Sequence, residues 1–265
     1  MEFDHIRYGC VDGVARLTLH RPERLNAFNA AMHVELRAAL DAVQADASAR
    51  VLLLAGAGRA FCAGQDLADP AVRFEPGSQP PDLGAVVERE FAPLVQRFSD
   101  LRVPTVAAVH GVAAGAGASL ALGCDIVVAA RSASFIQAFS SIGLVPDTGG
   151  TWVLPQRVGM ARALGLAMLA ERLPAPQAAD WGLIWAVHDD AAFPAEVDAL
   201  VARLAAGPTR ALVRTRQAMH AAARNTLAQQ LALEAGYIRE LGRSADYIEG
   251  VAAFMAKRPP HFRGD

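Results

Sequence analysis

The stretch V-H-G-V-A-A-G-A-G-A-S-L-A-L-G-C-D, residues 109–125, decides the fold of this chain and holds its first candidate site. Its glycines lie between an apolar run of β type, 103–109, and a short Ala/Leu helix that we predict to end near Gly123. Glycine allows a tight turn and a close approach to the backbone, and free N–H groups at a helix start suit an oxygen that is becoming negative. The alternative is that the glycines only let a helix pack tightly on a strand, and this stretch alone does not separate the two.

Outward from this stretch, strand patterns alternate with helix patterns, which is typical of an α/β fold. Residues 14–19 and 50–55 are apolar runs of strand length, and apolar residues recur at helical spacing over 30–47. Residues 69–84 hold four prolines and two glycines and are predicted to be irregular. Further along we expect helices at 85–99, 160–170 and 176–181, and strands at 104–109, 125–129, 134–139 and 183–187.

The character of the chain changes after Pro194. Residues 195–257 contain no convincing strand pattern and predict three or four helices, broken at Gly207-Pro208, at Asn225 and near Gly242. We therefore predict a core domain over residues 1–195, which holds the candidate site, and a helical region over 196–265.

Composition excludes several classes of function. A chain of 265 residues with 53% hydrophobic and 20% charged residues can bury a large core, and a net charge of -2 gives no general attraction to nucleic acid. The three cysteines lie far apart without a C-x-x-C pair, which fits a reducing cytoplasm. The first residues, M-E-F-D-H-I-R, do not have the pattern of a secretory signal.

Residues 103–123 carry no charge and have the length of a membrane span. They also contain Pro104, His110 and four glycines, and no basic cluster or aromatic belt flanks them. We expect a buried strand, loop and helix here rather than a membrane segment.

A second glycine loop, A-G-Q-D-L at 63–67, follows a strand in the same way as A-A-G-A-G at 113–117. Two N–H groups from separate loops, aimed at one carbonyl oxygen, would stabilise an enolate. The first glycine stretch is no dinucleotide fingerprint, because Leu120 stands where a third glycine is needed. The seven histidines show no spacing typical of a metal site, so no metal is expected.

Asp147, in V-P-D-T-G-G-T, has two interpretations. It lies where an extended run turns into a helix, so its carboxylate could cap that helix, and spacing alone favours this role. The second role is general acid and base.

Other polar residues near the two loops are predicted to be structural. Asp66 and Asp125 are predicted to bond backbone donors in their loops, and Cys62 is predicted to pack. Ser119 lacks the G-x-S-x-G surroundings of a nucleophile.

Four ordered motifs together resemble the crotonase superfamily of enoyl-CoA hydratases and isomerases: L-H-R-P-E-R-L-N-A-F-N, F-C-A-G-Q-D-L, the glycine stretch through G-C-D, and G-L-V-P-D-T-G-G-T. R-S-A-D-Y-I-E-G-V-A-A-F and A-K-R-P-P-H-F-R-G are similar to the branch of 1,2-epoxyphenylacetyl-CoA isomerases. The resemblance implies a crotonase-like spiral of ββα turns with a C-terminal helical region that forms a homotrimer or a dimer of trimers. It also implies an acyl-CoA substrate and no separate cofactor.

The resemblance also implies roles for particular residues. The N–H groups of Gln65 and Ala116 would form the oxyanion hole, although many relatives have glycine where Ala116 stands. Asp147 would carry the proton, which reverses the preference for a helix cap. The other positions implied to contact substrate or coenzyme A are Arg24, Leu25, Ala63, Gly64, Asp66, Leu67, Gly115, Gly117 and Phe139, with Phe254 and Lys257 reaching the site of a neighbouring subunit.

The departures from the family pattern disfavour hydration. Hydratases carry two glutamates that activate water, and the matching positions here hold Ser119 and Phe139. Together with the resemblance to the epoxide-isomerase branch, this implies an isomerase that converts the ring 1,2-epoxide of phenylacetyl-CoA to an oxepin, with a related capacity to shift a β,γ double bond to α,β. An enoyl-CoA hydratase and a non-catalytic acyl-CoA-binding subunit are the alternatives.

Overall fold

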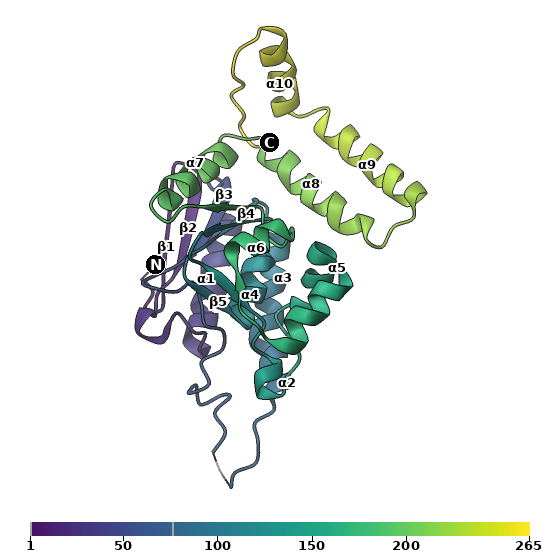
Figure 1. The fold of residues 1–265 in the computed structure, drawn as a ribbon. Coiled ribbons are helices and arrows are strands. Elements are labelled where there is room, and N and C mark those ends of the chain that lie inside the picture. Colours follow the sequence, from purple (N-terminus) through teal and green to yellow (C-terminus); the bar gives the residue numbers. More distant parts are fainter. Residues whose placement is uncertain (1, 76) are drawn as a thin grey trace.

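The computed structural model describes residues 2–75 and 77–265. A six-stranded sheet lies at the centre of this part of the chain (Figure 1). Its order is β1-β2-β3-β4-β6-β9, and β1 is antiparallel to β2 whereas the other neighbours are parallel. The strands β3 and β4 are apolar on both faces, as expected where helices cover a parallel sheet. The bounds are β1 (Ile6–Val11), β2 (Val14–Leu19), β3 (Val51–Gly56), β4 (Thr105–Val109), β6 (Ile126–Ala130) and β9 (Ala186–His188).

A second, three-stranded sheet produces the spiral. It contains β5 (Val112–Ala114), β7 (Ser134–Ile136) and β8 (Leu173–Pro174) among the described residues. The order β4, β5, α4 and then β6, β7, α5 makes two successive ββα turns, which confirms the expected crotonase-like fold. The strand β5 was not predicted, because it has only three residues and lies inside the glycine stretch that we expected to be a loop.

The strand β1 was also missed. Every second residue is exposed, only Ile6 among the others is fully buried, and the charged and glycine positions hide the apolar pattern. The sequence nevertheless contained a signal for this hairpin, the pair Asp12-Gly13. In the structure both residues have positive φ and form the two-residue turn between β1 and β2. An Asp-Gly pair between short runs is a strong indicator of a hairpin.

The helices of the core largely follow the predictions. Helix α1 (Ala30–Ala45) begins after Asn29, whose side chain accepts a hydrogen bond from the N–H of Met32. The helix expected at 85–99 is a continuous segment of α2 (Leu83–Val86), a π-helical stretch (Val87–Phe91) and α3 (Ala92–Asp100). Helix α4 (Ala116–Leu122) and helix α6 (Ala175–Asp180) lie close to their predicted positions.

Helix α5 (Gly150–Leu169) corrects a prediction, since it starts at Gly150 rather than at residue 160. Pro155 and a kink at Gly159, whose φ is 73°, interrupt it. These two residues obscured the helical pattern of its first half.

Three or four helices were predicted for the end of the chain, and its described residues form α7 (Phe193–Ala205), α8 (Thr209–Ala222), α9 (Leu227–Leu241) and α10 (Ala245–Met255). Phe193, Val197 and Val201 of α7 belong to the buried core, so residue 195 lies inside a helix of that core. The division into two domains at this residue stays a prediction. Helices α8–α10, here called the C-terminal arm, extend away from the sheet (Figure 1).

Buried polar contacts attach this arm to the core. Arg216 of α8 pairs with Asp125 at 3.0 Å and donates to the carbonyl oxygens of Val103 and Leu101. Asp125 also accepts a hydrogen bond from the N–H of Thr105, which confirms its predicted structural role. The arm therefore has a defined attachment to the core even though most of its length does not touch the sheet.

None of the described helices is long and apolar enough to cross a membrane. The uncharged residues 103–123 form β4, β5 and α4.

A buried histidine of α1 makes the stability of the fold depend on pH. His33 stacks on Phe28 and meets Phe91 edge-on, with ring centroids 5.3 and 4.4 Å away, and burial lowers its pKa from 6.5 to about 4. Below pH 6.5 the unfolded chain therefore binds a proton that the folded chain excludes, and stability falls as the pH drops towards 4. We expect this site to remove about 3 kcal/mol between pH 8 and pH 4.

Urea titrations of the wild type and the His33→Leu variant at both pH values measure this contribution. Both proteins share all other titrating groups. Between pH 8 and pH 4 the free energy of unfolding should therefore fall by about 3 kcal/mol less in the variant than in the wild type. Equal losses in the two proteins would show that His33 does not remain neutral in the folded state.

Candidate active site

Backbone hydrogen bonds join the two glycine loops. The N–H of Cys62 donates to the carbonyl oxygen of Val112 at 3.1 Å, and the N–H of Ala114 donates to that of Cys62 at 2.8 Å. A Cβ on Gly64 would lie 2.9 Å from the oxygen of Ala114 and 3.4 Å from the nitrogen of Ala116. The loop after β3 and the segment from β5 to α4 are therefore in van der Waals contact, with the backbones of Gly64 and Ala116 next to each other.

A third segment, residues 25–28, fixes the first loop from its other side. The N–H of Ala63 donates to the carbonyl oxygen of Leu25 at 3.0 Å, and that of Phe28 donates to Gly64 at 2.8 Å. Within this segment Asn26 is fully buried, and its side-chain amide donates to the carbonyl oxygens of Ala57, Ala60 and Phe61. The L-N-A-F-N motif thus serves to hold the loop 63–67 in place.

The two candidate amides are free of protein partners. In the described part of the chain, neither the N–H of Gln65 nor that of Ala116 donates a hydrogen bond to another residue. Ala116 is the first residue of α4, where a backbone N–H has no acceptor within the helix. Gly115 before it has φ 52° and ψ -127°, a conformation that side-chain-bearing residues strongly avoid.

Gln65 and Ala116 both line a cavity of about 540 Å³, a size that suits a small ligand. Its lining is mostly apolar, and Asp147 is the one ionisable side chain among the described residues that form it. The lining consists of Ala63, Gly64, Gln65, Leu67, Val72, Phe74, Leu83, Val86, Val87, Phe91, Gly115, Ala116, Ala138, Phe139, Ile142, Leu144 and Asp147.

The carboxyl group of Asp147 does not cap a helix. Helix α5 begins after Gly149, and no side chain caps it, so the interpretation that spacing alone favoured is wrong. The Thr148 hydroxyl donates to Oδ1 of Asp147 at 2.8 Å. Burial raises the pKa of Asp147 above its ordinary value, against the opposing effects of this hydroxyl and of the residue's own N–H. A carboxyl group in such a position can hold a proton and release it.

The structure thus brings together eight of the predicted site residues around one cavity. They are Ala63, Gly64, Gln65, Leu67, Gly115, Ala116, Phe139 and Asp147.

Asp66 and Gly117 lie outside the lining of this cavity. Asp66 pairs with Arg21 at 3.0 Å and accepts a hydrogen bond from the N–H of Ala68, as expected of a loop carboxylate. Gly117 packs on Cys62, where a Cβ would come within 2.7 Å of the thiol sulfur.

Arg24 and Leu25 also lie outside the lining. Arg24 ends a short 3₁₀ helix, and Leu25 follows it with φ 50°. The carbonyl oxygen of Leu25 accepts the hydrogen bond from the N–H of Ala63 in the first glycine loop.

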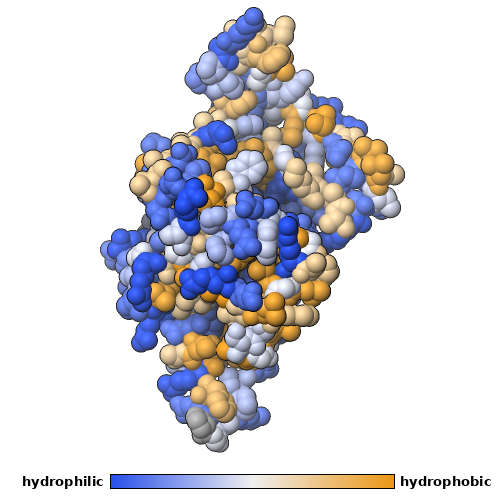
Figure 2. All heavy atoms as spheres, viewed as in Figure 1, coloured by the Kyte–Doolittle hydropathy of each residue, from blue (hydrophilic) through white to orange (hydrophobic). Residues whose placement is uncertain are grey.

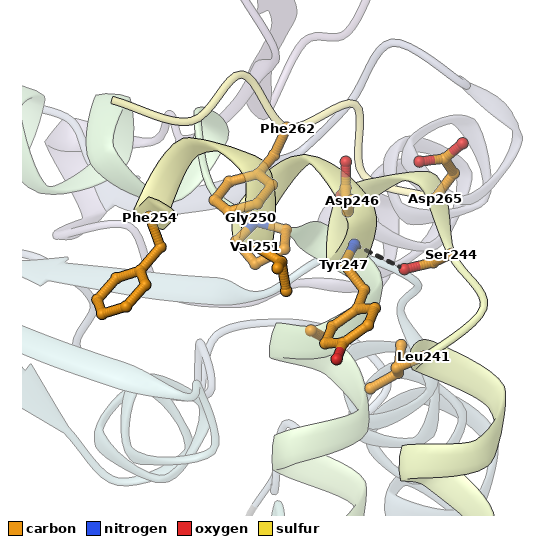
Figure 3. Close-up of a pocket in the computed structure, with 11 residues that line it drawn as sticks. Leu241, Ser244, Asp246, Tyr247, Gly250, Val251, Phe254, Phe262 and Asp265 are labelled. Atoms are coloured by element: carbon orange, nitrogen blue, oxygen red, sulfur yellow. Dashed lines mark hydrogen bonds between the residues drawn. The ribbon is translucent and has the colours of Figure 1, made fainter. Parts of the chain in front are cut away.

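Phe254 and Lys257 lie at and just beyond the end of α10, on the C-terminal arm. Phe254, Tyr247 and Val251 project from one face of α10 into a separate apolar cavity of about 430 Å³ (Figure 3). More than three quarters of Phe254 is exposed. These residues therefore do not take part in the site that their own chain forms around Asp147.

No glutamate lines the cavity among the described residues, which leaves no pair of carboxylates to activate water. Ser119, at the first position where hydratases carry glutamate, is buried in α4 and lies outside the lining. Phe139, at the second, contributes an aromatic ring to the wall.

This fold, with two unpartnered amides and a carboxyl group around one cavity, agrees with the relationships of the sequence. The chain belongs to the enoyl-CoA hydratase/isomerase family, whose model matches residues 10–265. It is 56% identical over 252 residues to the 1,2-epoxyphenylacetyl-CoA isomerase of Escherichia coli, covering 95% of each chain.

Other relatives carry hydratase names. A probable enoyl-CoA hydratase of Rhodobacter capsulatus is 51% identical over 264 residues, covering 100% of each chain. The crystal structure of an enoyl-CoA hydratase from Bacillus anthracis superposes with a TM-score of 0.91 at 28% identity, covering 99% of this chain and 100% of that one. Family membership alone therefore leaves both reactions open, and the residues of the cavity must decide.

Sequence reasoning missed the apolar half of the cavity. Val86, Val87 and Phe91 come from the segment α2 to α3, and Ile142 and Leu144 from the turn before Asp147. A π-helical stretch is a frequent sign of a functional site, but only coordinates reveal it. Thr148, the hydrogen-bond partner of Asp147, was missed as well, although it is the next residue in the sequence.

Proposed function

We propose that this chain is an acyl-CoA isomerase that converts ring-1,2-epoxyphenylacetyl-CoA to oxepin-CoA. The observation that carries the proposal is that Asp147 shares one apolar cavity with the backbone amides of Gln65 and Ala116 and with no second ionisable side chain in the described lining. The 56% identical relative from Escherichia coli carries the name of this activity.

The proposed chemistry needs two functions from the protein. The amides of Gln65 and Ala116 stabilise the negative charge that develops on the thioester oxygen when the α-carbon loses a proton. Asp147 accepts that proton, and the resulting electron pair opens the epoxide on the way to the seven-membered ring. The proton returns from Asp147 to the product, so that substrate and product have the same atoms. Coenzyme A enters only as part of the substrate, and the proposal includes no separate cofactor.

The same groups would also move a double bond. With a β,γ-enoyl-CoA, Asp147 would take the proton from the α-carbon and return it to the γ-carbon, which brings the double bond into conjugation with the thioester. We include this activity because it needs no group beyond those already in the cavity.

Turnover in H₂¹⁸O, with the phenylacetyl epoxide thioester and a 3-enoyl-CoA as parallel substrates, tests the proposal. We expect isomer products without label at carbon, because no carboxylate pair is available to activate water in the described lining. Labelled oxygen at the β-carbon of a 3-hydroxyacyl product would instead establish an enoyl-CoA hydratase.

We further propose that the chain works as a homotrimer or a dimer of trimers in the cytoplasm, without nucleic-acid or membrane partners. Arg24 and Leu25 would contact the nucleotide and pantetheine of coenzyme A, and Phe254 and Lys257 would reach that of a neighbouring subunit. In support, the arm exposes large apolar side chains between polar ones (Figure 2), including Met219, Leu231, Ile238, Tyr247, Phe254 and Met255. Exposed apolar surface of this kind commonly marks a protein interface.

A charge placed at Phe254 should disrupt this assembly. We expect Phe254→Asp to sediment as a smaller species and to bind coenzyme A about tenfold more weakly, since a buried aromatic anchor is often an interface hot spot. Val11→Asp is the control, because Val11 is also a largely exposed apolar residue but lies on the edge strand β1. A Phe254→Asp protein of unchanged mass and affinity would contradict the proposed role of the arm.

A further inference from the structure

The residue after Asp147 has an unusual backbone conformation. Thr148 has φ 54° and Gly149 has φ 77° and ψ 5°, while the N–H of Gly150 donates to the carbonyl oxygen of Asp147 at 2.8 Å. Two consecutive residues with positive φ inside such a hydrogen-bonded turn define the type I′ class. Asn, Asp and Gly are the residues that usually take these places.

Threonine is a poor choice for this conformation. A β-branched residue with positive φ is a genuine outlier, because its side chain crowds the backbone. Thr148 is only 6% exposed, so the surrounding structure holds it there. Conformations of this kind persist at functional sites where the side chain has a task that a less strained residue would not perform.

The contacts of the Asp147 carboxyl group indicate the role of the Thr148 side chain. Among the described residues, Thr148 is the one whose side chain donates a hydrogen bond to the Asp147 carboxyl group, from its hydroxyl to Oδ1 at 2.8 Å. The rest of the cavity wall is apolar or neutral, with the aromatic ring of Phe139 in it, and no other charged side chain contributes to the pKa of Asp147. Besides the hydrogen bond from the N–H of Asp147 itself, this hydroxyl is therefore the contact that orients the carboxyl group among the described residues.

We propose that Thr148 is a positioning residue, whose hydroxyl holds Oδ1 of Asp147 so that Oδ2 accepts the proton from the substrate and returns it. The inference rests on the proposed role of Asp147 as proton carrier and adds which of its oxygens does the work. A hydrogen bond donated to an ionised carboxylate stabilises that form, so the hydroxyl also favours the state that can accept a proton. Asp147 is then ready as a base despite its burial.

The Thr148→Val and Thr148→Ser variants test this role. Valine has the same branched shape without the hydroxyl, and serine keeps the hydroxyl, so the pair separates hydrogen bonding from packing. The pKa of Asp147 is measured in the substrate-free protein by ¹³C NMR of labelled aspartate carboxyl groups, with Asp147→Asn used to assign its signal. We expect this pKa to be higher in Thr148→Val than in the wild type and to return in Thr148→Ser.

Kinetics give the second readout. We expect the acid limb of the kcat/KM profile to move to higher pH in Thr148→Val, and kcat to fall about tenfold with KM unchanged, as for the loss of one charge-assisted hydrogen bond. Thr148→Ala, which also lacks the hydroxyl, replaces Thr148→Val if the latter fails to fold.

An unchanged Asp147 pKa and an unchanged kcat in the valine or alanine variant would overturn the proposal. So would a loss of activity that serine fails to restore, because the effect would then arise from packing. The NMR titration needs no substrate, and this separates the inference from the proposed function. Full turnover by Asp147→Asn would remove the proton carrier itself, whereas an inactive Asp147→Asn beside an unaffected Thr148→Val would remove only the role of Thr148.

Discussion

The Asp147→Asn variant is expected to lose isomerase turnover by about 10²–10⁴-fold, the usual contribution of a general acid–base group, while it still binds acyl-CoA. Asparagine keeps the shape of the side chain and can still accept from the Thr148 hydroxyl, but it cannot take up a proton. Because no other ionisable side chain lines the cavity among the described residues, we expect no neighbour to substitute for it. Turnover and coenzyme A binding are measured on the same preparation, by product analysis and by calorimetry.

The pH dependence of the wild type should carry the signature of the same group. Burial raises the pKa of Asp147, so the acid limb of the kcat/KM profile should lie above the range of an ordinary aspartate. Asp189→Asn, which removes an exposed carboxylate beside Arg131, is the matched control and should leave rate and profile unchanged. Full turnover by Asp147→Asn would exclude Asp147 from the mechanism. A wild type that binds acyl-CoA and turns over neither test substrate would favour the non-catalytic binding subunit.

The Gly64→Ala variant should have the second largest effect, a loss of about 10²–10³ in rate, which is typical when one oxyanion donor is removed. A Cβ at this position would lie 2.9 Å from the carbonyl oxygen of Ala114 and 3.4 Å from the nitrogen of Ala116, and Gly64 has φ 94°. The loops must therefore shift apart, which moves the amides of Gln65 and Ala116 out of register with a single oxygen.

Gly77→Ala separates this effect from backbone strain alone. Gly77 has a similar φ of 86°, but a Cβ there would meet no atom within 4 Å. We expect Gly77→Ala to keep most of the activity, and circular dichroism and thermal unfolding establish that both variants are folded. If a folded Gly64→Ala protein kept the wild-type rate, the alignment of the two amides would not be needed for the reaction.

Local patterns predicted most of the fold because each depends on neighbours in the sequence. The helical spacing over residues 30–47 predicted α1, and the break predicted near Gly242 precedes α10, whose first turn is capped by the Ser244 hydroxyl accepting from the N–H of Tyr247. The failures had local causes too, since Pro155 and Gly159 interrupt the helical pattern of α5. The short strand β5 consists of three residues and is stabilised by partners distant in sequence.

Sequence patterns likewise predicted some parts of the candidate site and missed others. The motifs A-G-Q-D-L and A-A-G-A-G were enough to identify the two glycine loops that carry the amides, because glycine positions report backbone requirements directly. Spacing alone favoured a helix cap for Asp147, whereas the resemblance implied a proton carrier, and the tertiary structure shows Asp147 in the lining of the cavity. Phe139 was expected at the site from the resemblance, but its apolar neighbours Val86 and Phe91 were not, because they come from a separate helical segment.

The sequence by itself determined the family, most of the helices and longer strands, and the backbone groups available for an oxyanion, since hydrophobic spacing and glycine placement act over a few residues. Only the tertiary structure decided that Gly64 contacts the backbone of Ala116, that Asp147 faces the same cavity, and that Thr148 bonds to its carboxyl group. The physical reason is that these relations depend on how the two sheets and α5 pack against one another. The same packing buries the carboxyl group and raises its pKa, and neither the burial nor the shift can be read from the order of residues.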